Sequence, residues 1–316
     1  MHKRNLINRR DFVRSIPATG MAVVSFGKTG ELLPDNPEIS PQMQNDYFKI
    51  AFDSKSLRLN VIRGDGAGFL SGSFVRIFSD NRLIRTDSGS YRHAIEVKRL
   101  SDPAGDGRHM RVRFRDTERK INIELDIFLF DKIHAFTIEA FCTNVSAKPL
   151  NIRQIDPVCA LRDENGALFW PETSKILTNG PMYYDSGEVK EFTAPGSDFV
   201  KSWWNVGLFR GYNNEGLACG TLENKSSLGN IKARRETGNG ISLTAQSILA
   251  EGFVLQPGKT VKSNKFIFLI NKDPYSALES YADLAGTYLK ARNGSILNGW
   301  CSWFYTYEFV TEEEVL

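Results

Sequence analysis

The chain has 316 residues, of which 41% are hydrophobic and 24% are charged, a composition typical of a globular protein with one large core or two smaller ones. Its 40 lysines and arginines nearly balance its 37 aspartates and glutamates, which leaves a net charge of +3. No block of basic residues is interleaved with aromatic residues, so the composition argues against a nucleic-acid partner.

The four cysteines are widely spaced, and the sequence contains no Cys-x-x-Cys motif and no paired histidines. This spacing predicts neither a zinc site nor a disulfide framework. Small buried thiols are the simpler interpretation for most of them. We therefore expect no metal site and no cofactor. The cysteines are Cys142, Cys159, Cys219 and Cys301.

Residues 1–30 are predicted to be an export signal. The adjacent arginines Arg9 and Arg10 precede a short, weakly apolar run from Ile16 to Phe26. This pattern resembles a twin-arginine signal, whose apolar segment is too short to span a bilayer. It predicts a periplasmic or secreted bacterial protein without a membrane span. The alternative is a disordered basic tail, because no clear Ala-x-Ala cleavage site follows.

Residues 31–46 contain three prolines and are predicted to be a linker. Residues 47–272 are predicted to form a large antiparallel β-sandwich, because their dominant hydrophobic period is two and no helical pattern interrupts them. The length of this region and its number of strand-like runs exceed those of an immunoglobulin-like domain. Strand-like runs, separated by Gly, Pro, Asn or Asp, lie at Phe48–Phe52, Leu57–Ile62, Phe69–Phe78, Ala94–Leu100, Ile133–Phe141, Leu150–Leu161, Val206–Tyr212, Gly216–Leu222, Ile241–Leu249 and Val261–Ile270.

The clearest part of this region is a hairpin around a polar turn at residues 116–119. One face of the hairpin is apolar and is expected to face the core. The other face places arginines opposite acidic and amide side chains, and we expect it to be solvated. The apolar side chains are Met110, Val112 and Phe114 in the first strand and Ile121, Ile123, Leu125 and Ile127 in the second.

Residues 273–294 are predicted to form a connecting helix. Asp273 is suited to the N-cap and Pro274 to the first helical position. Asn293-Gly294 is expected to end the helix. A stripe of apolar residues at spacings of three and four indicates that one side packs. This stripe comprises Ala277, Leu278, Tyr281, Leu284, Ala285, Tyr288 and Leu289.

Residues 295–316 are predicted to be a strand, a loop and the first turn of a helix. The strand carries Gly299-Trp300-Cys301-Ser302-Trp303. Thr311 and Glu314 have capping-box spacing, and the sequence stops at Leu316, one turn later. A strand that feeds a capped helix is how a β/α unit begins, and several such units close a barrel. We therefore expect the start of a truncated (β/α)₈ barrel.

These residues resemble the melibiase-type α-galactosidases, glycoside hydrolases with a (β/α)₈ barrel behind a large N-terminal β-sandwich. The resemblance is strong from about residue 255 onward and diffuse before it. It implies that Trp303 lines a galactose pocket and that the partner is an α-galactoside oligosaccharide or polysaccharide. In that family the two catalytic aspartates lie on later barrel strands, so this sequence contains no catalytic residues and the chain is expected to be inactive.

A stand-alone carbohydrate-binding or interaction module is the alternative function, and the sequence leaves open whether the chain forms a homo-oligomer.

Gly64–Gly68 lacks the Lys-Ser/Thr of a phosphate loop and is expected to be a turn. Trp203-Trp204 and Trp170-Pro171 suit sugar stacking by chemistry, but large aromatic residues are more often structural. The three strand-region histidines are too scattered to predict a triad. They are His93, His109 and His134.

Overall fold

The computed structural model describes residues 41–291, except residues 81, 89–90, 119, 171–172, 181–186, 194, 197 and 252, together with residue 311. The described residues belong to one compact unit. The predicted export signal, most of the predicted linker and almost all of the predicted barrel unit, including Trp303, lie outside the described residues. Within the described part of the chain, no helix is long and apolar enough to cross a membrane.

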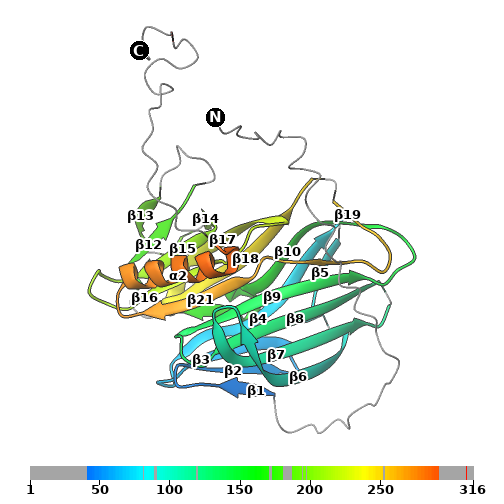
Figure 1. Ribbon diagram of the computed structural model, residues 1–316, viewed down its shortest axis with the longest axis horizontal. Coiled ribbons are helices and arrows are strands. Elements are labelled where there is room, and N and C mark those ends of the chain that lie inside the picture. The colour runs from blue at the N-terminus through cyan, green and yellow to red at the C-terminus, as the bar shows by residue number, and fades with distance from the viewer. Residues whose placement is uncertain are drawn as a thin grey trace, which may run out of the picture. The chain divides into compact units, whose positions relative to one another are not determined.

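Two antiparallel β-sheets make up the fold (Figure 1). The first sheet has the order β1-β2-β3-β4-β10-β18-β17-β14, and three short strands pair alongside: β5 with β4, β19 with β10, and β11 with β4 and β18. Its strands are β1 (Gln42–Gln44), β2 (Phe48–Asp53), β3 (Arg58–Arg63), β4 (Gly68–Ser79), β5 (Arg82–Arg85), β10 (Leu150–Ala160), β11 (Ala167–Phe169), β14 (Val200–Trp203), β17 (Ser227–Arg235), β18 (Gly240–Leu249) and β19 (Val254–Leu255).

The second sheet has the order β13-β12-β15-β16-β21-β9-β8-β7-β6, and β20 pairs with β9. Its strands are β6 (Tyr91–Asp102), β7 (Gly105–Asp116), β8 (Ile121–Phe130), β9 (Ala135–Asn144), β12 (Lys175–Thr178), β13 (Glu188–Glu191), β15 (Asn205–Phe209), β16 (Gly216–Thr221), β20 (Thr260–Lys262) and β21 (Phe266–Asn271). The mainly β fold and the antiparallel β-sandwich are thus confirmed. The described residues do not include a barrel unit.

The main core lies between the two sheets and is rich in phenylalanine. Phe48 and Phe69 of the first sheet contact Phe136 of the second, with ring centroids 5.1 and 6.0 Å apart and the rings nearly perpendicular. Phe136 also stacks on Phe268 at 5.0 Å. All four side chains are buried. Each such aromatic pair contributes roughly 0.5–1.5 kcal/mol beyond the burial of its area, so these rings hold the sheets together.

The predicted hairpin forms between β7 and β8. Val112 pairs directly with Leu125, and Phe114 with Ile123. All the apolar side chains predicted for its dry face are buried. In the turn, the carboxylate of Asp116 accepts hydrogen bonds from three backbone N–H groups, those of residues 118, 120 and 121. Period-two alternation fixes the faces here, and the aspartate fixes the turn.

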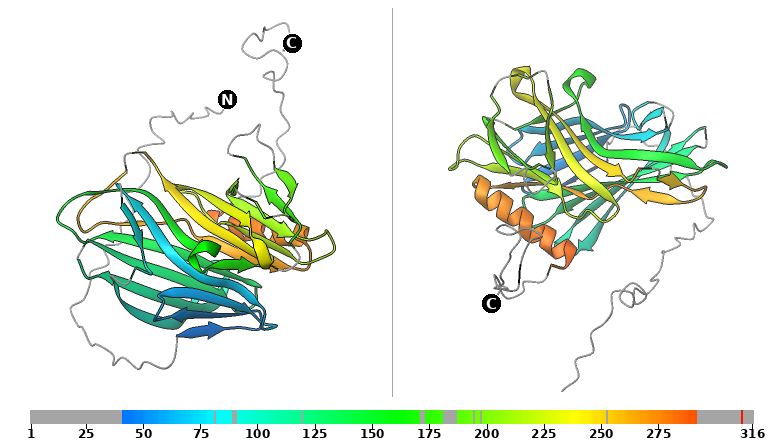
Figure 2. Two further views of the ribbon diagram at one scale, coloured as in Figure 1. Left: turned by 180° about the vertical axis from the view of Figure 1, so that it is seen from behind. Right: turned by 90° about the horizontal axis from the view of Figure 1, so that it is seen from above.

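Helix α2 (Pro274–Leu289) covers the outer face of the second sheet, where it packs on β15, β16 and β21 (Figure 2). As predicted, Asp273 caps it by accepting a hydrogen bond from the backbone N–H of Ser276 at 2.8 Å. The helix ends earlier than the predicted Asn293-Gly294, because Lys290 adopts a left-handed conformation (φ 53°, ψ 44°). Leu289, in the last turn, is 52% exposed and does not belong to the packed stripe.

The structure confirms some of the remaining sequence predictions and changes others. Gly64–Gly68 is a turn between β3 and β4, and Gly66 has a positive φ of 86°. The predicted linker contains β1. The predicted strand Val261–Ile270 is two strands, because buried Ser263 and Asn264 turn their N–H groups to Ala140 O and Ser247 Oγ. The cysteines of the described chain are free and buried: Cys142, Cys159 and Cys219.

Candidate functional site

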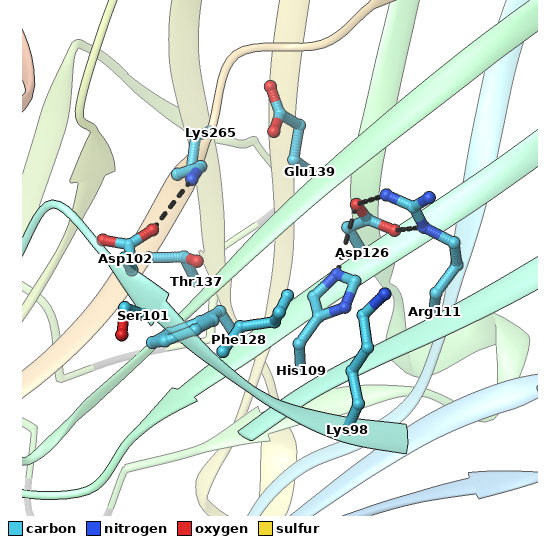
Figure 3. A pocket seen from close by; sticks show the side chains of 11 residues that line it. Lys98, Ser101, Asp102, His109, Arg111, Asp126, Phe128, Thr137, Glu139 and Lys265 are labelled. Carbon is cyan, nitrogen blue, oxygen red and sulfur yellow. Dashed lines mark hydrogen bonds and ion pairs between the residues drawn. The ribbon is translucent and has the colours of Figure 1, made fainter. Parts of the chain in front are cut away.

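A pocket of about 200 Å³ opens on the outer face of the second sheet, over β6 to β9 (Figure 3). It was not predicted from the sequence. Its walls come from four strands and from the residue that precedes β21. It is lined by Lys98, Leu100, Ser101, Asp102, His109, Arg111, Asp126, Phe128, Thr137, Glu139 and Lys265.

Strand register explains why these side chains meet. The apolar residues of β7 and β8 face the core, so their alternate neighbours face outward. Two rows of outward side chains cross the sheet through directly paired positions, about 4.5–5.5 Å apart between Cα atoms. One row is Lys98, His109, Phe128 and Thr137, and the other is Glu96, Arg111, Asp126 and Glu139.

Asp126 is the most strongly bonded carboxylate of the pocket. Arg111 donates to both of its oxygens, from Nε to Oδ1 at 2.7 Å and from Nη2 to Oδ2 at 2.6 Å. His109 Nε2 lies 3.2 Å from Oδ2. Burial alone would raise the pKa of Asp126, but the hydrogen bonds from Arg111 and His109 outweigh it and hold this pKa below its usual value. Asp126 is therefore a fixed, charged acceptor.

One ring nitrogen of His109 has no hydrogen-bond partner in the part of the chain that the structure describes. Its side chain is only 9% exposed, and while Nε2 faces Asp126, the buried Nδ1 has no hydrogen-bond partner among the described residues. Figure 3 shows the ring between Asp126 and Lys98. A buried polar atom without a partner costs roughly 1–3 kcal/mol. This nitrogen carries almost no exposed surface, so a molecule in the pocket would reach it only if the ring or a neighbouring side chain shifts.

Glu139 lies directly across from Asp126 on β9, and its pKa is shifted in the opposite direction. Burial raises the pKa of Glu139, although the ammonium of Lys262 lies 2.8 Å from its Oε1 and lowers it. Retaining glycoside hydrolysis needs two carboxyl groups that both face the sugar. Because Arg111 and His109 occupy both oxygens of Asp126, we interpret the pocket as a binding site and not as a catalytic pair.

The end of α2 forms a support for one wall of the pocket. The hydroxyl of Tyr288 hydrogen-bonds Oδ1 of Asp102, and the ammonium of Lys265 lies 3.3 Å from Oδ2 of the same carboxylate. That ammonium also lies 4.9 Å from the centroid of the Tyr288 ring. Asp102 is thus held from the helix and from the start of β21.

The expectation that this face of the hairpin is solvated holds only in part, since the side chains of Arg111 and Glu124 are 31% and 26% exposed. The side chain of His109 is 9% exposed, and that of Asp126 is 15% exposed. The reason is tertiary: Lys265 lines the pocket beside these strands, and Tyr288 of α2 contacts Asp102 at its wall. The cross-strand charge pairing itself was expected and is found, since Arg111 lies opposite Asp126.

The residues singled out in the sequence lie elsewhere. Trp303, the predicted galactose-site residue, lies outside the described residues. Trp170 is buried in the core, which confirms its structural interpretation. Trp203 ends β14 in the first sheet, where the ammonium of Lys201 lies 4.3 Å from its ring centroid, and Trp204 is 40% exposed. In the described part of the chain, no group of three or more His, Cys, Asp and Glu side chains is placed to hold a metal.

No protein-family model matches the sequence, and no curated protein matches it. Solved structures match in fold. An α-galactosidase from Lactobacillus brevis has a TM-score of 0.55 at 12% identity, and the match covers 87% of this chain and 46% of that one. An α-N-acetylgalactosaminidase from Bifidobacterium bifidum has a TM-score of 0.53 at 12% identity, with 80% and 39% covered. A family 36 α-galactosidase variant from Geobacillus stearothermophilus, in complex with stachyose, has a TM-score of 0.51 at 10% identity, with 88% and 47% covered.

The chain therefore spans less than half the length of these three proteins. At such low identity the likeness concerns the fold alone. The resemblance predicted from the sequence is confirmed at that level: this chain has the β-sheet fold of a part of the α-galactosidase and α-N-acetylgalactosaminidase structures.

Proposed function

We propose that this chain is the N-terminal portion of an α-galactosidase-like retaining glycoside hydrolase that acts on terminal α-galactosides. The observation that carries the proposal is the order of three features along the chain. A sandwich with the fold of part of two glycosidase structures is followed directly by α2 and then, in sequence, by the Gly299–Trp303 motif. That motif resembles the first barrel strand of the same enzymes.

Under this proposal the chemistry belongs to a barrel. One barrel aspartate would attack the anomeric carbon, and a second would act first as an acid and then as a base. Trp303 would form a wall of the galactose site by stacking on the apolar face of the sugar. The stachyose bound to the Geobacillus enzyme supports an α-galactoside as the ligand class. The adjacent arginines Arg9 and Arg10 support export to the periplasm or beyond.

The decisive experiment compares two proteins on 4-nitrophenyl α-galactoside. The 316-residue chain should show no hydrolysis, because both aspartates are absent. A protein extended by the coding sequence that follows codon 316, in the same frame or after a frameshift, should hydrolyse the substrate. In that longer protein, Trp303→Ala should lower kcat/KM about 10- to 100-fold through lost stacking, and Trp303→Phe should retain most of it.

Two results would contradict the proposal. One is hydrolysis by the 316-residue chain that survives repurification. The other is downstream coding sequence without barrel strands, together with an inactive extended protein. In that second case the alternative, a stand-alone carbohydrate-binding or interaction module, would be preferred.

A further inference from the structure

The pocket on the second sheet is balanced in charge. A ligand with a net charge would have to compete with ion pairs that already exist, so the balance favours a neutral ligand. Each charged lining residue has an opposite charge beside it: Lys98 has Glu96 at 3.4 Å, Arg111 has Asp126 at 2.6 Å, Lys265 has Asp102 at 3.3 Å, and Glu139 has Lys262 at 2.8 Å.

The pocket offers both donors and acceptors of hydrogen bonds. Lys98 and Lys265 can donate, Glu139 can accept, and the hydroxyl groups of Ser101 and Thr137 can do either. A hydroxyl group on a ligand can likewise both donate and accept. A surface that mixes donors and acceptors at this density therefore suits a molecule with several hydroxyl groups.

His109 adds a specific position for one such hydroxyl. Because Nε2 faces Asp126, the neutral ring would present Nδ1 as an acceptor. This nitrogen is buried and has no partner in the described part of the chain. A ligand hydroxyl that donates to it would remove the cost of the unpaired atom.

The size and one apolar wall also limit the ligand. The pocket holds about 200 Å³, whereas a cavity of roughly 150 Å³ accommodates benzene, so a single six-membered ring fits. Phe128 lies in the same row as His109 and lines the pocket. The residue is only 6% exposed, so it gives the apolar face of a pyranose a small patch to contact.

We propose that this pocket binds one neutral hexopyranose unit of a saccharide, at a non-catalytic site separate from any barrel. The proposal does not depend on the glycosidase function, because the pocket lies wholly within the described sandwich and its occupancy is measured without catalysis. A ligand of about 12 heavy atoms that gains about 0.3 kcal/mol per atom binds with a Kd in the millimolar range.

The test is a titration of the 316-residue chain, followed by isothermal calorimetry and by saturation-transfer NMR. Three probes separate the ligand classes: stachyose and maltotetraose are neutral, and tetragalacturonate is anionic. We expect saturable binding of at least one neutral probe and at least tenfold weaker binding of tetragalacturonate. Binding that favours the anionic probe, or no saturation by either neutral probe at 50-fold the protein concentration and above about 20 mM, would overturn the proposal.

Two variants of His109 test the unpartnered nitrogen. His109→Gln keeps an amide that can donate to Asp126 but has no counterpart of Nδ1, so we expect Kd for the neutral probe to rise about tenfold. His109→Asn places an amide near the Nδ1 position and should retain more affinity. Equal affinity of His109→Gln and the unmodified chain would refute the role of this nitrogen. Circular dichroism spectra confirm that each variant is folded.

Lys98→Met tests whether binding occurs at this pocket. Glu96 remains paired with Arg113 at 3.1 Å in that variant, so no carboxylate loses its only partner. Lys190→Met on β13 is the matched control, because Lys190 has similar exposure and pairs with Glu188 at 3.0 Å in the same strand. We expect Lys98→Met to weaken binding about three- to tenfold and Lys190→Met to leave it unchanged. Equal effects of the two variants would place the binding elsewhere and contradict the proposal.

Discussion

Because of Asp156, we predict that one contribution to the free energy of unfolding grows as the pH falls from 7 to 5. Its side chain, in β10 of the first sheet, is fully buried. Arg76 donates to Oδ2 from Nε at 2.9 Å, and Gln154 donates to Oδ1 from Nε2 at 2.6 Å. Burial nevertheless raises the pKa of Asp156 to about 6, from an ordinary value of 3.8, although Arg76 acts against the rise. The folded protein therefore binds a proton here that the unfolded chain releases.

The sign and size of the effect follow from this difference. A carboxyl group whose pKa is higher in the folded state contributes stability that is fully present below pH 3.8 and is lost as the pH rises through about 6. At pH 5, the folded-state pKa lies one unit above the pH and the unfolded-state value lies below it. The contribution of Asp156 at pH 5 thus exceeds that at pH 7 by about 1.4 kcal/mol.

The assay is urea denaturation at pH 5, 6 and 7, with the unmodified chain compared with Asp156→Asn. The asparagine keeps the shape but cannot titrate. The free energy of unfolding of the unmodified chain, minus that of the variant, should grow by about 1.4 kcal/mol between pH 7 and pH 5. Taking this difference removes the contributions of all other titrating groups that the substitution does not touch.

Asp87→Asn is the control. Burial acts to raise the pKa of Asp87, but hydrogen bonds and charges from Arg85 and Arg58 outweigh it and lower this pKa. Its stabilising effect is therefore constant above pH 3.8 and is lost only as the pH falls further. The corresponding difference for Asp87→Asn should be flat from pH 5 to pH 7. A flat difference for Asp156→Asn as well would refute the reasoning about its burial.

Two further predictions concern helix docking and export. In Gly220→Ala, the new Cβ would lie 2.6 Å from the ring of Tyr281 in α2; this overpacking should cost about 1–3 kcal/mol and lower Tm by several degrees in a thermal scan. Gly196→Ala, whose nearest contact would be 3.6 Å, should leave Tm unchanged, and equal Tm values for the two variants would show that the helix yields freely. Replacing Arg9-Arg10 by two lysines should retain the protein in the cytoplasm. Unchanged fractionation between cytoplasm and periplasm would show that the segment is only a basic tail and not an export signal.

The sequence predicts strands where a long alternation gives one apolar face, and it misses short or polar strands and also β17, whose buried face mixes Ile231 and Ala233 with Ser227 and Gly229. The β7–β8 hairpin was predicted with its correct faces, because alternation over ten residues records which side is buried. Strand β13 has four exposed residues, Glu188–Glu191, and β14 is only four residues long. Such edge strands are held by backbone hydrogen bonds to a neighbour, which leave no periodic trace in the side chains.

The pocket could be predicted only in part, for a related reason. Alternation shows that His109 and Asp126 share an outward face, but it cannot show that the face is enclosed. The enclosure comes from Lys265 and from Tyr288, which lie far along the chain and meet at Asp102. Long-range burial of this kind depends on how sheet and helix pack, and a single sequence does not encode it as a local pattern.

Helix α2 connects the local signals that the sequence shows with the long-range contacts that it does not show. Its start is set by local signals, the Asp273 cap and Pro274, and its position on the sheet is set by Tyr281, whose hydroxyl donates to the backbone oxygen of Thr221 at 2.7 Å. Tyr288 lies seven residues beyond Tyr281, which is close to two helical turns, so both side chains project from the same side of the helix. The contact that fixes the helix on the sheet therefore also directs Tyr288 toward Asp102 at the wall of the pocket.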